Sequence, residues 1–266
     1  MDKIYIIKIG GNIIDDEEKL SSFLKEFAVL DARKILVHGG GKLATKLAEQ
    51  MNVPQQMVEG RRITDAETLK IVTMVYAGYI NKNIVARLQA HGCNALGLSG
   101  ADGNVIQAHK RVSPNPPLGT EGYGFVGDVD GINAALFKSL LEQNISLVLA
   151  PITHDRQGQL LNTNADTIAQ EVAKGLGKIY DVSLVYSFEK PGVLLDAENE
   201  ASVINQITPA YYQELKEKKL VFAGMIPKLD NAFAALYSGV KKVIIGKAEN
   251  IHELIAGTSG TTIVNE

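Results

Sequence analysis

Cysteine is almost absent from this chain, and long apolar runs are missing altogether. One cysteine, Cys93, stands among 266 residues, so no intrachain disulfide can form, as is typical of proteins from a reducing compartment. No apolar run approaches the ~18 residues needed to cross a bilayer. The first run, residues 4–7, is too short for a secretion signal and ends at Lys8. We therefore expect a soluble cytoplasmic protein without a membrane span, in which Cys93 is a small buried hydrophobic residue.

An excess of basic residues is also lacking. The formal net charge is −3 and the isoelectric point is near 6.0. A protein whose main partner is nucleic acid or an anionic membrane surface would carry a basic excess, so we expect neither partner. A small anionic ligand is compatible with this balance, because a few cations in one pocket are enough to bind it.

Several familiar functional motifs are missing as well. The glycine-rich stretches match neither GxGxxG nor GxxxxGK[ST], so neither a dinucleotide site nor a Walker-type phosphate loop is indicated. No arrangement of serine, histidine and aspartate typical of hydrolases is present. None of the five histidines is spaced with cysteine or carboxylate residues as in a metal site. We therefore expect no metal ion held by the protein itself and interpret His38 as structural.

The chain does contain a regular alternation of strand and helix patterns. Aliphatic runs predict buried strands, and apolar residues at helical spacing predict helices between them. The predicted strands are residues 4–9, 34–37, 94–98, 145–150, 179–186, 242–245 and 261–264, and the predicted helices are 17–30, 43–51, 64–91, 132–143, 209–217, 227–237 and 250–255. This order predicts an α/β protein with a mainly parallel sheet, either as one large domain or as two lobes that share the sheet.

Three segments add detail to this pattern. A capping box at Thr64 and Glu67 begins the long helix, which ends before Gly92. Residues 103–127 are rich in proline and glycine and predict hairpins, with an exposed loop around residues 113–122. The stretch LNTNAD follows a turn and leads into a further helix. The weakest join between two lobes lies near residues 174–178.

Lysine and glycine stand together at the end of the first predicted strand. Lys8 interrupts an isoleucine-rich run, where burial of its charge requires a partner, and Gly10 and Gly11 follow it. Three more glycines, residues 39–41, follow the second strand. Because ligands bind at the carboxyl ends of strands in open α/β sheets, and glycine lets backbone N–H groups approach an anion, these residues indicate a shared ligand cleft. Two alternatives stay open: tight turns, and a lysine that extends from a strand into solvent.

Polar residues at predicted helix starts are further candidates. Asn162, Asn164 and Asp166 stand at the start of one helix, where a single cap suffices, so two of them could face a ligand. Lys228 stands in the first turn of another helix, where the dipole favours anions, and Arg62 could grip a carboxylate. Ordinary capping and a solvated lysine are the alternatives. Together these residues indicate anion chemistry, and phosphoryl transfer fits it, since that reaction consists mostly of positioning and charge neutralisation.

An ordered set of motifs resembles a known family. The stretches KIGGN, HGGGK, GRRIT, LNTNAD and GMIPK stand in the order found in the N-acetylglutamate kinases of the amino acid kinase superfamily, and the resemblance covers essentially the whole chain. It implies a three-layer α-β-α sandwich whose mainly parallel central sheet is continuous across two lobes. Residues 1–175 would form the acyl-amino-acid-binding lobe with a dimer interface, and residues 176–266 the nucleotide-binding lobe.

The resemblance also implies an activity and roles for single residues. The activity is transfer of the ATP γ-phosphoryl group to the side-chain carboxylate of N-acetyl-L-glutamate, a step of arginine biosynthesis, with Mg²⁺ held mainly by the nucleotide phosphates. Lys8 and Lys228 would flank the transferred group, and Asp166 would hold both ammonium groups. The implied phosphate-binding residues are Gly10 and Gly11, and the implied substrate-binding residues are Gly40, Gly41, Arg62 for the α-carboxylate and Asn162 for the amide.

One segment departs from the family pattern. Family members usually show Ser/Thr-Asp-Val-x-Gly-Val after the strand that begins the nucleotide lobe, whereas residues 186–194 of this chain are YSFEKPGVL. Glu189 is the candidate substitute for the missing aspartate, and we make no prediction for single ribose or adenine contacts. Two alternative functions stay open: a kinase for another N-acyl-glutamate, such as N-succinyl-glutamate, and a non-catalytic metabolite sensor of the same fold.

The expected assembly is a homodimer. The first predicted strand begins at residue 4, which resembles the dimeric members that lack the N-terminal helix of arginine-inhibited hexamers. The helix that begins at Thr64 carries more apolar residues than one buried stripe requires, so we expect it to form part of the dimer interface. These apolar residues are Ile71, Val72, Met74, Val75 and Tyr76.

Overall fold

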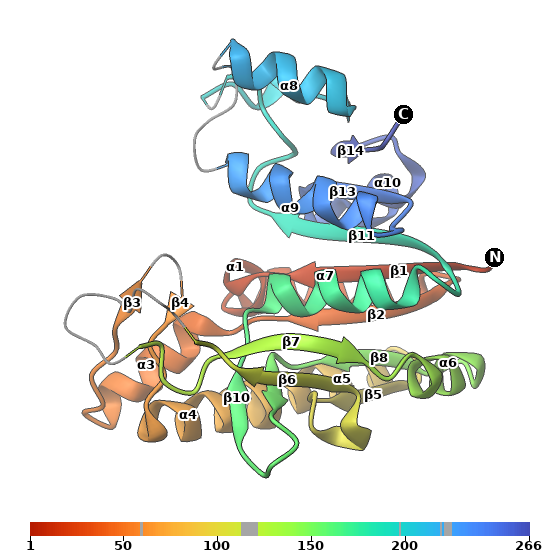
Figure 1. The fold of residues 1–266 in the computed structure, drawn as a ribbon. Helices are drawn as coiled ribbons and strands as arrows, with labels where there is room; N and C mark the ends of the chain where they lie inside the picture. The colour runs from red at the N-terminus through yellow and green to blue at the C-terminus, as the bar shows by residue number, and fades with distance from the viewer. Residues whose placement is uncertain (59–60, 113–121, 197, 219, 221–224) are drawn as a thin grey trace.

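The protein folds into three layers around one large sheet (Figure 1). The computed structural model describes the chain except for residues 59–60, 113–121, 197, 219 and 221–224. The sheet has eight strands in the order β12-β14-β13-β11-β1-β2-β8-β5, and only β13 and β14 pair antiparallel. Its strands are β1 (Lys3–Ile9), β2 (Arg33–His38), β5 (Ala95–Leu98), β8 (Ser146–Leu149), β11 (Asp181–Phe188), β12 (Gln206–Ile207), β13 (Lys242–Lys247) and β14 (Thr261–Ile263). The predicted α/β class with a mainly parallel, continuous sheet is confirmed.

Helices cover both faces of this sheet. One face packs against α6 (Ala134–Glu142), α7 (Ala165–Leu176), α8 (Pro209–Glu217) and α9 (Ile226–Tyr237). The other packs against α1 (Gly11–Ile14), α2 (Glu17–Val29), α3 (Gly41–Gln50), the long helix that begins at Ala66, and α10 (Ile251–Ala256). Single turns of 3₁₀-helix occupy η2 (Asp102–Asn104), η3 (Glu200–Ser202) and η5 (Ala248–Asn250).

Strand β1 lies in the middle of the sheet and is buried on both faces. Because successive side chains of a strand point to opposite faces, Ile4 and Ile6 join the core under α7, whereas Ile7 and Ile9 join the core under α2 and α3. Lys8 has the same parity as Ile4 and Ile6, so its side chain points to the same face of the sheet, the one covered by α7. The period of the strand thus aims Lys8 at the helix that begins just after LNTN.

Two small sheets extend the first part of the chain. Strands β6 (Ile106–Lys110), β7 (Gly127–Ile132), β9 (Ile152–His154) and β10 (Leu160–Asn162) form a sheet in the order β10-β9-β6-β7, and β3 (Met57–Val58) pairs with β4 (Arg61–Arg62). The predicted hairpins within residues 103–127 are confirmed only in part: β6 pairs antiparallel, but its partner β7 begins at Gly127 and runs beyond the predicted range. Most of the predicted exposed loop lies outside the described residues. The predicted helix at 132–143 begins later, at Ala134, because residues 127–132 pair in β7 and Asn133 caps the helix.

The long predicted helix is continuous but not uniform. It consists of α4 (Ala66–Thr73), a π-helical segment η1 (Met74–Ile80) and α5 (Asn81–Ala90). The prediction that Thr64 is its cap is wrong. Asp65 Oδ1 accepts the N–H of Thr68 at 2.7 Å, while the Thr64 hydroxyl donates to the carbonyl of Arg62 at 2.9 Å.

The apolar surplus of this helix does not form an exposed face. Ile71, Val72, Val75 and Tyr76 are buried within the single chain, and only Met74 among the five residues is exposed. The helix is covered on more than one side, because it packs against α2, α3 and the sheet, so it needs more than one apolar stripe. Four of these five residues are therefore unavailable to a second chain, and a dimer interface on this helix stays a prediction.

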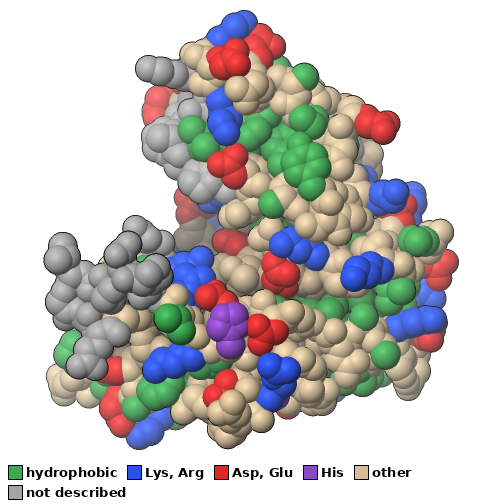
Figure 2. All heavy atoms as spheres, viewed as in Figure 1, with side chains coloured by type: hydrophobic (Ala, Val, Ile, Leu, Met, Phe, Trp, Pro, Cys, Tyr) green, Lys and Arg blue, Asp and Glu red, His purple; other side chains and the backbone are tan. Residues whose placement is uncertain are grey.

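The surface carries charges of both signs. Figure 2 shows acidic and basic side chains intermixed over the face in view, in keeping with the small net charge, and a hollow between the part that holds α8 and α9 and the part below it. Cys93 is buried, as predicted. Among the described residues, no helix is long and apolar enough to span a bilayer.

His38, at the end of β2, is fully buried as a neutral ring, which confirms its structural interpretation. Its Nδ1 donates to the carbonyl of Gly39 at 2.9 Å, because a carbonyl only accepts, and its Nε2 accepts from the Asn81 amide at 3.2 Å. Burial lowers the pKa of His38 from 6.5 to about 4, despite the bond to Gly39.

This burial predicts acid sensitivity of the fold. The unfolded chain binds a proton at His38 more readily than the folded one, so stability should fall as the pH falls from about 6.5 to about 4, by up to about 3 kcal/mol. Urea unfolding at a series of pH values in this range measures the slope. A His38→Gln variant, which has no imidazole to titrate, should show a shallower slope. Equal slopes for the two proteins would contradict the prediction.

Candidate functional site

Two cavities lie at one edge of the large sheet. The carboxyl ends of β1, β2 and β11 meet there, because neighbouring parallel strands end at the same edge. The smaller cavity has a volume of about 210 Å³ and the larger one of about 1090 Å³, and both are lined by Lys8, Gly10, Gly11 and Gly41. The structure therefore brings the end of β1 and a glycine after β2 to the boundary between the two cavities.

Lys8 has a charged partner, Asp166. Its Nζ lies 2.8 Å from Asp166 Oδ1, and 14% of the Lys8 side chain is exposed against 45% of the Asp166 side chain. Asn164 is the cap of α7, since its Oδ1 accepts the N–H groups of Asp166 and Thr167, which leaves the Asp166 carboxylate free to face β1. The expected contact between Lys8 and Asp166 is confirmed. It explains how a lysine is accommodated in an isoleucine-rich strand.

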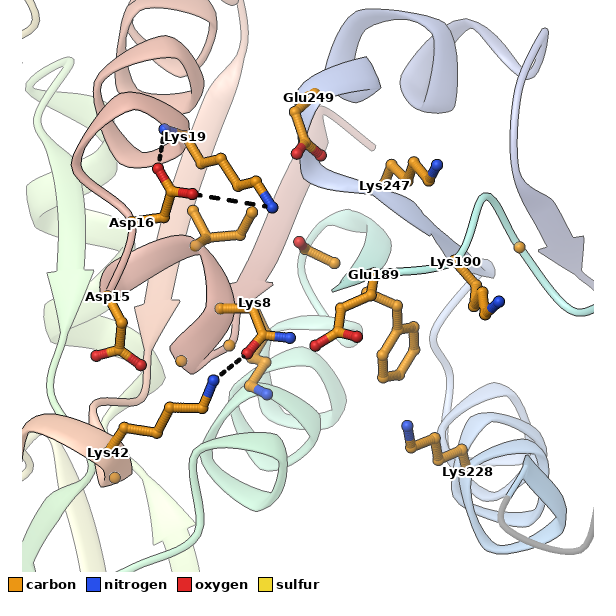
Figure 3. Close-up of a pocket in the computed structure, with 18 of the residues that line it drawn as sticks. Lys8, Asp15, Asp16, Lys19, Lys42, Glu189, Lys190, Lys228, Lys247 and Glu249 are labelled. Carbon is orange, nitrogen blue, oxygen red and sulfur yellow. Dashed lines mark hydrogen bonds and ion pairs between the residues drawn. The ribbon is translucent and has the colours of Figure 1, made fainter. Parts of the chain in front are cut away.

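Lys228 lies in the first turn of α9 and lines the larger cavity on the side opposite Lys8 (Figure 3). Figure 3 shows its side chain extending from α9 toward the side of the cavity that holds Lys8. Within the part of the chain that the structure describes, Lys228 forms no ion pair, and its Nζ lies 3.9 Å from the centroid of the Phe188 ring. The expectation that Asp166 holds both ammonium groups is met for Lys8 alone. Partial burial lowers the pKa of Lys228; the Asp166 carboxylate opposes this change and the Lys8 ammonium adds to it.

The smaller cavity combines two arginines, Arg61 and Arg62, with amide and apolar side chains. Arg62 is 7% exposed, and its Nη2 donates to the carbonyl of Gly41 and to the Thr45 hydroxyl, both at 2.9 Å. Asn162, at the end of β10, donates to the Thr64 hydroxyl at 3.0 Å. The apolar lining consists of Met57, Tyr76, Val126, Pro151 and Ala165. Such a cavity suits a small molecule that carries a carboxylate, an amide and a short apolar group.

Gly40 closes the smaller cavity against the long helix. Its φ of +147° is rarely adopted by residues with a side chain, and a Cβ there would lie 2.3 Å from Ile80 Cδ1 and 3.1 Å from Tyr76 Cδ1. Both residues belong to η1, which therefore sits directly against the glycine loop. Only glycine permits this close approach.

Replacement of Gly40 by alanine should consequently destabilise the fold by about 1–3 kcal/mol, measured as the free energy of unfolding in urea. Gly78→Ala is a matched control in the same helix, because a Cβ at Gly78 meets no atom within 4 Å. The control should be as stable as the parent or slightly more stable. Equal stability of Gly40→Ala and the parent would show that the loop relaxes around a Cβ.

The larger cavity is rich in lysine (Figure 3). Its lysines are Lys8, Lys19, Lys42, Lys190, Lys228 and Lys247. Lys42 donates to Asn12 Oδ1 at 2.5 Å, and Lys247 pairs with Glu200 at 2.9 Å. Carboxylates are also present, and burial raises the pKa of one of them, Asp15, against the effect of Lys42. A surface of lysines and carboxylates suits a polyanion that binds together with a cation.

No protein-built metal site is apparent in this region. Among the described residues, no group of three or more histidine, cysteine, aspartate or glutamate side chains could hold a metal ion. Glu189, the candidate substitute in the unusual segment, lines the larger cavity. A divalent cation that arrives on the phosphates of a nucleotide needs few ligands from the protein, which fits this donor set.

Sequence reasoning missed several residues of the site. Tyr76 lines the smaller cavity, and burial raises the pKa of its hydroxyl while the Arg62 guanidinium opposes the change. Lys42 and Asn12 bridge the two glycine loops. Lys42 was visible as the last residue of HGGGK, whereas no pattern indicated Tyr76, because it lies in the apolar stripe of a helix.

Comparison with known proteins agrees with this geometry. The model of the amino acid kinase family matches residues 3–247. An acetylglutamate kinase from Cytophaga hutchinsonii is 56% identical over 266 residues, which cover 99% of each chain. One from Parabacteroides distasonis is 54% identical over 95% of this chain and 97% of its own, and one from Methanopyrus kandleri is 39% identical over 93% and 96%.

Solved structures show the same architecture. The structure of smu.665 from Streptococcus mutans has a TM-score of 0.76 at 30% identity and covers 99% of both chains. Carbamate kinase from Giardia lamblia, bound to AMP-PNP, has a TM-score of 0.72 at 14% identity over 100% of this chain and 99% of its own, a likeness of fold alone. The chain therefore belongs to the amino acid kinase family and, within it, to the acetylglutamate kinases.

Proposed function

We propose that this enzyme transfers the γ-phosphoryl group of ATP to the side-chain carboxylate of N-acetyl-L-glutamate, as a step of arginine biosynthesis. The observation that carries the proposal is the position of Lys8, held by Asp166 at the boundary between a small and a large cavity. A phosphoryl group passing from one cavity to the other would have to pass this ammonium group. The names of the relatives supply the acyl amino acid, and the chemistry of the two cavities supports it.

The smaller cavity is the proposed acyl-amino-acid site. The Arg62 guanidinium would bind the α-carboxylate, and the Asn162 amide would bind the acetamido group. Hydrogen bonds to Gly41 and Thr45 already fix the Arg62 guanidinium, so little side-chain entropy is lost on binding. The reacting carboxylate would then lie beside Lys8 and the backbone N–H groups of Gly40 and Gly41.

The larger cavity is the proposed nucleotide site. Both the proposed acyl-binding part, residues 1–175, and the proposed nucleotide-binding part, residues 176–266, contribute residues to its lining, so the nucleotide would bind between the two parts. Gly10 and Gly11 would donate N–H groups to phosphoryl oxygens, and Glu189 would take the place of the family's aspartate. Mg²⁺ bound to the nucleotide phosphates would neutralise part of their charge.

The reaction needs little from the protein beyond position and charge. The side-chain carboxylate attacks the γ-phosphorus in line with the departing ADP oxygen, so one P–O bond forms as the other breaks. Lys8 and Lys228 would stabilise the charge that spreads over the phosphoryl oxygens. Asp166 would keep the Lys8 ammonium in place, and no general base is required, because the attacking carboxylate is already ionised near neutral pH.

The direct test is ATP-dependent formation of an acyl phosphate, trapped as its hydroxamate, with N-acetyl- and N-succinyl-glutamate side by side. Preferred turnover of the acetyl compound supports the proposal. Preferred turnover of the succinyl compound would mean that the protein is a kinase for an N-acyl-glutamate with a bulkier acyl group. Folded protein that binds both ligands and forms no hydroxamate would overturn it in favour of a metabolite sensor.

Arg62→Ala should chiefly raise KM for the acyl amino acid, by about 10–100-fold, because charge-assisted hydrogen bonds to the α-carboxylate are lost. Steady-state kinetics with each substrate varied in turn measures the change. Since Arg62 also bonds Gly41, the melting temperature of the variant must be recorded as a control. A rise confined to KM for ATP would mean that the two cavities have been assigned the wrong way round.

We also propose a homodimer in the cytoplasm. The buried single cysteine supports a reducing compartment. Met74 and Tyr79 are exposed on η1, and Leu96 is partly exposed on the edge strand β5, so this side of the molecule offers apolar contacts for a second copy. Light scattering coupled to gel filtration gives the mass; a monomer at micromolar concentration would contradict the proposal.

A further inference from the structure

The two lysines of the site are held by different chemistry. Lys8 pairs with a carboxylate, whereas the ammonium of Lys228 lies over the face of an aromatic ring, 3.9 Å from the centroid of Phe188. This is the shortest of the cation–aromatic contacts described in the structure, and both of its residues line the larger cavity. Among the described residues, Phe188 alone makes such a contact with Lys228.

We propose that Phe188 is a positioning residue for Lys228, holding its ammonium at the cavity by a cation–π contact without neutralising it. The inference rests on the proposed function and deepens it. A carboxylate in the place of the ring would form an ion pair, which an incoming phosphoryl group would have to break. The ring attracts the cation more weakly, so Lys228 keeps its whole charge and leaves the ring readily.

The strand places the two aromatic side chains for this purpose. Tyr186 and Phe188 are two residues apart in β11, so they point to the same face of the sheet, and their ring centroids are 6.4 Å apart. Lys8 on β1 lies directly beside Tyr186 on β11. The Tyr186 side chain is buried and is close enough to Asp166 to feel the charge of its carboxylate. Phe188 lies one step further toward the cavity, and α9 brings Lys228 above it. The row of two rings thus runs from the Lys8–Asp166 pair to Lys228.

The charges around Lys228 explain why it needs such support. Partial burial and the neighbouring Lys8 ammonium both lower the pKa of Lys228, while the carboxylates of Asp166 and Glu189 oppose the change without reaching ion-pair distance. The ring favours the charged form, because its negative face attracts a cation. Phe188 therefore helps to keep Lys228 both charged and directed into the cavity.

The test is Phe188→Leu, which keeps an apolar side chain but removes the ring face. We expect kcat to fall about three- to five-fold with KM for the acyl amino acid unchanged, and the alkaline limb of the pH profile of kcat to move to lower pH. Phe188→Tyr keeps a ring and should restore both. Phe233→Leu is a matched control in α9, because Phe233 stacks on Tyr212 rather than on a lysine. It should lower the melting temperature alone.

A second measurement makes the inference independent of turnover. Lysines of the ligand-free protein carrying ¹³C-methyl groups can be titrated by NMR, with Lys228 assigned by the signal lost in Lys228→Arg. In Phe188→Leu the pKa of Lys228 should fall by about 0.5 relative to the parent and to Phe233→Leu. An unchanged Lys228 titration in Phe188→Leu overturns the role of the ring. A shifted titration in a protein that forms no hydroxamate would uphold the contact while contradicting the kinase assignment.

Discussion

A Lys8→Ala variant is expected to lose about 10²–10³-fold in kcat, with a much smaller change in its affinity for the acyl amino acid. The reason is the place of this ammonium group. It lies largely shielded at the boundary of the two cavities, where charge develops on the phosphoryl oxygens only during transfer. An interaction that is stronger in the transition state than in the ground state appears in kcat rather than in KM.

Steady-state kinetics and calorimetric titration of each substrate measure the two quantities separately. Lys70→Ala is a suitable control, because in the described part of the chain Lys70 pairs with Glu67 alone, on the exposed side of α4. It should match the parent in both measurements. A Lys8→Ala enzyme with parental kcat would remove Lys8 from the mechanism and reduce the pair with Asp166 to a structural contact.

An Asp166→Asn variant should lose about tenfold to a hundredfold in kcat while keeping its fold. The amide has the shape of the carboxylate but no charge, so the Lys8 ammonium loses its ion pair and with it the fixed position beside the glycine loops. The fold should survive because Asn164, not Asp166, caps α7.

Asp65→Asn is the matched control, because it replaces another aspartate at a helix start by asparagine. It tests whether such a replacement lowers kcat wherever it is made. Asp65 caps α4 through the N–H of Thr68, and asparagine caps about as well as aspartate, so this variant should be neutral in kcat and in melting temperature. Full activity in Asp166→Asn would contradict the proposed role, and a cooperative unfolding transition near the parental temperature must accompany any loss of activity.

The ordered motifs were sufficient to predict the large sheet and one central contact. Lys8 and Asp166 could be brought together from the sequence because each belongs to a motif whose place in the fold is known. Their pairing also follows from the strand alternation that puts Lys8 on the α7 face. The partner of Lys228 could not be predicted in this way. It depends on how α9 packs over the end of β11, and Phe188 lies in the one segment that departs from the family pattern.

The long helix shows where local patterns are insufficient. Thr64 and Asp65 are both good capping residues, and the choice between them was decided by tertiary bonds, since the Thr64 hydroxyl donates to Arg62 and accepts from Asn162. The π-helical segment was not predicted, because over seven residues its apolar spacing is hard to distinguish from that of an α-helix. The sequence interpretation assigned the surplus apolar residues of this helix to a dimer interface. The number of apolar residues cannot reveal that the helix is covered on more than one side by its own chain.

The pairing of β1 with β11 also has a consequence for synthesis. β1 is the first strand to be synthesised, and β2, which pairs with one of its edges, follows soon afterwards. The other edge of β1 stays unpaired until β11, which begins at Asp181, has been synthesised. During that interval a strand rich in isoleucine exposes open backbone groups, which favours aggregation. Asp166 on α7 is translated shortly before β11. The charged partner of Lys8 and the strand that closes its other edge thus become available at almost the same stage of translation.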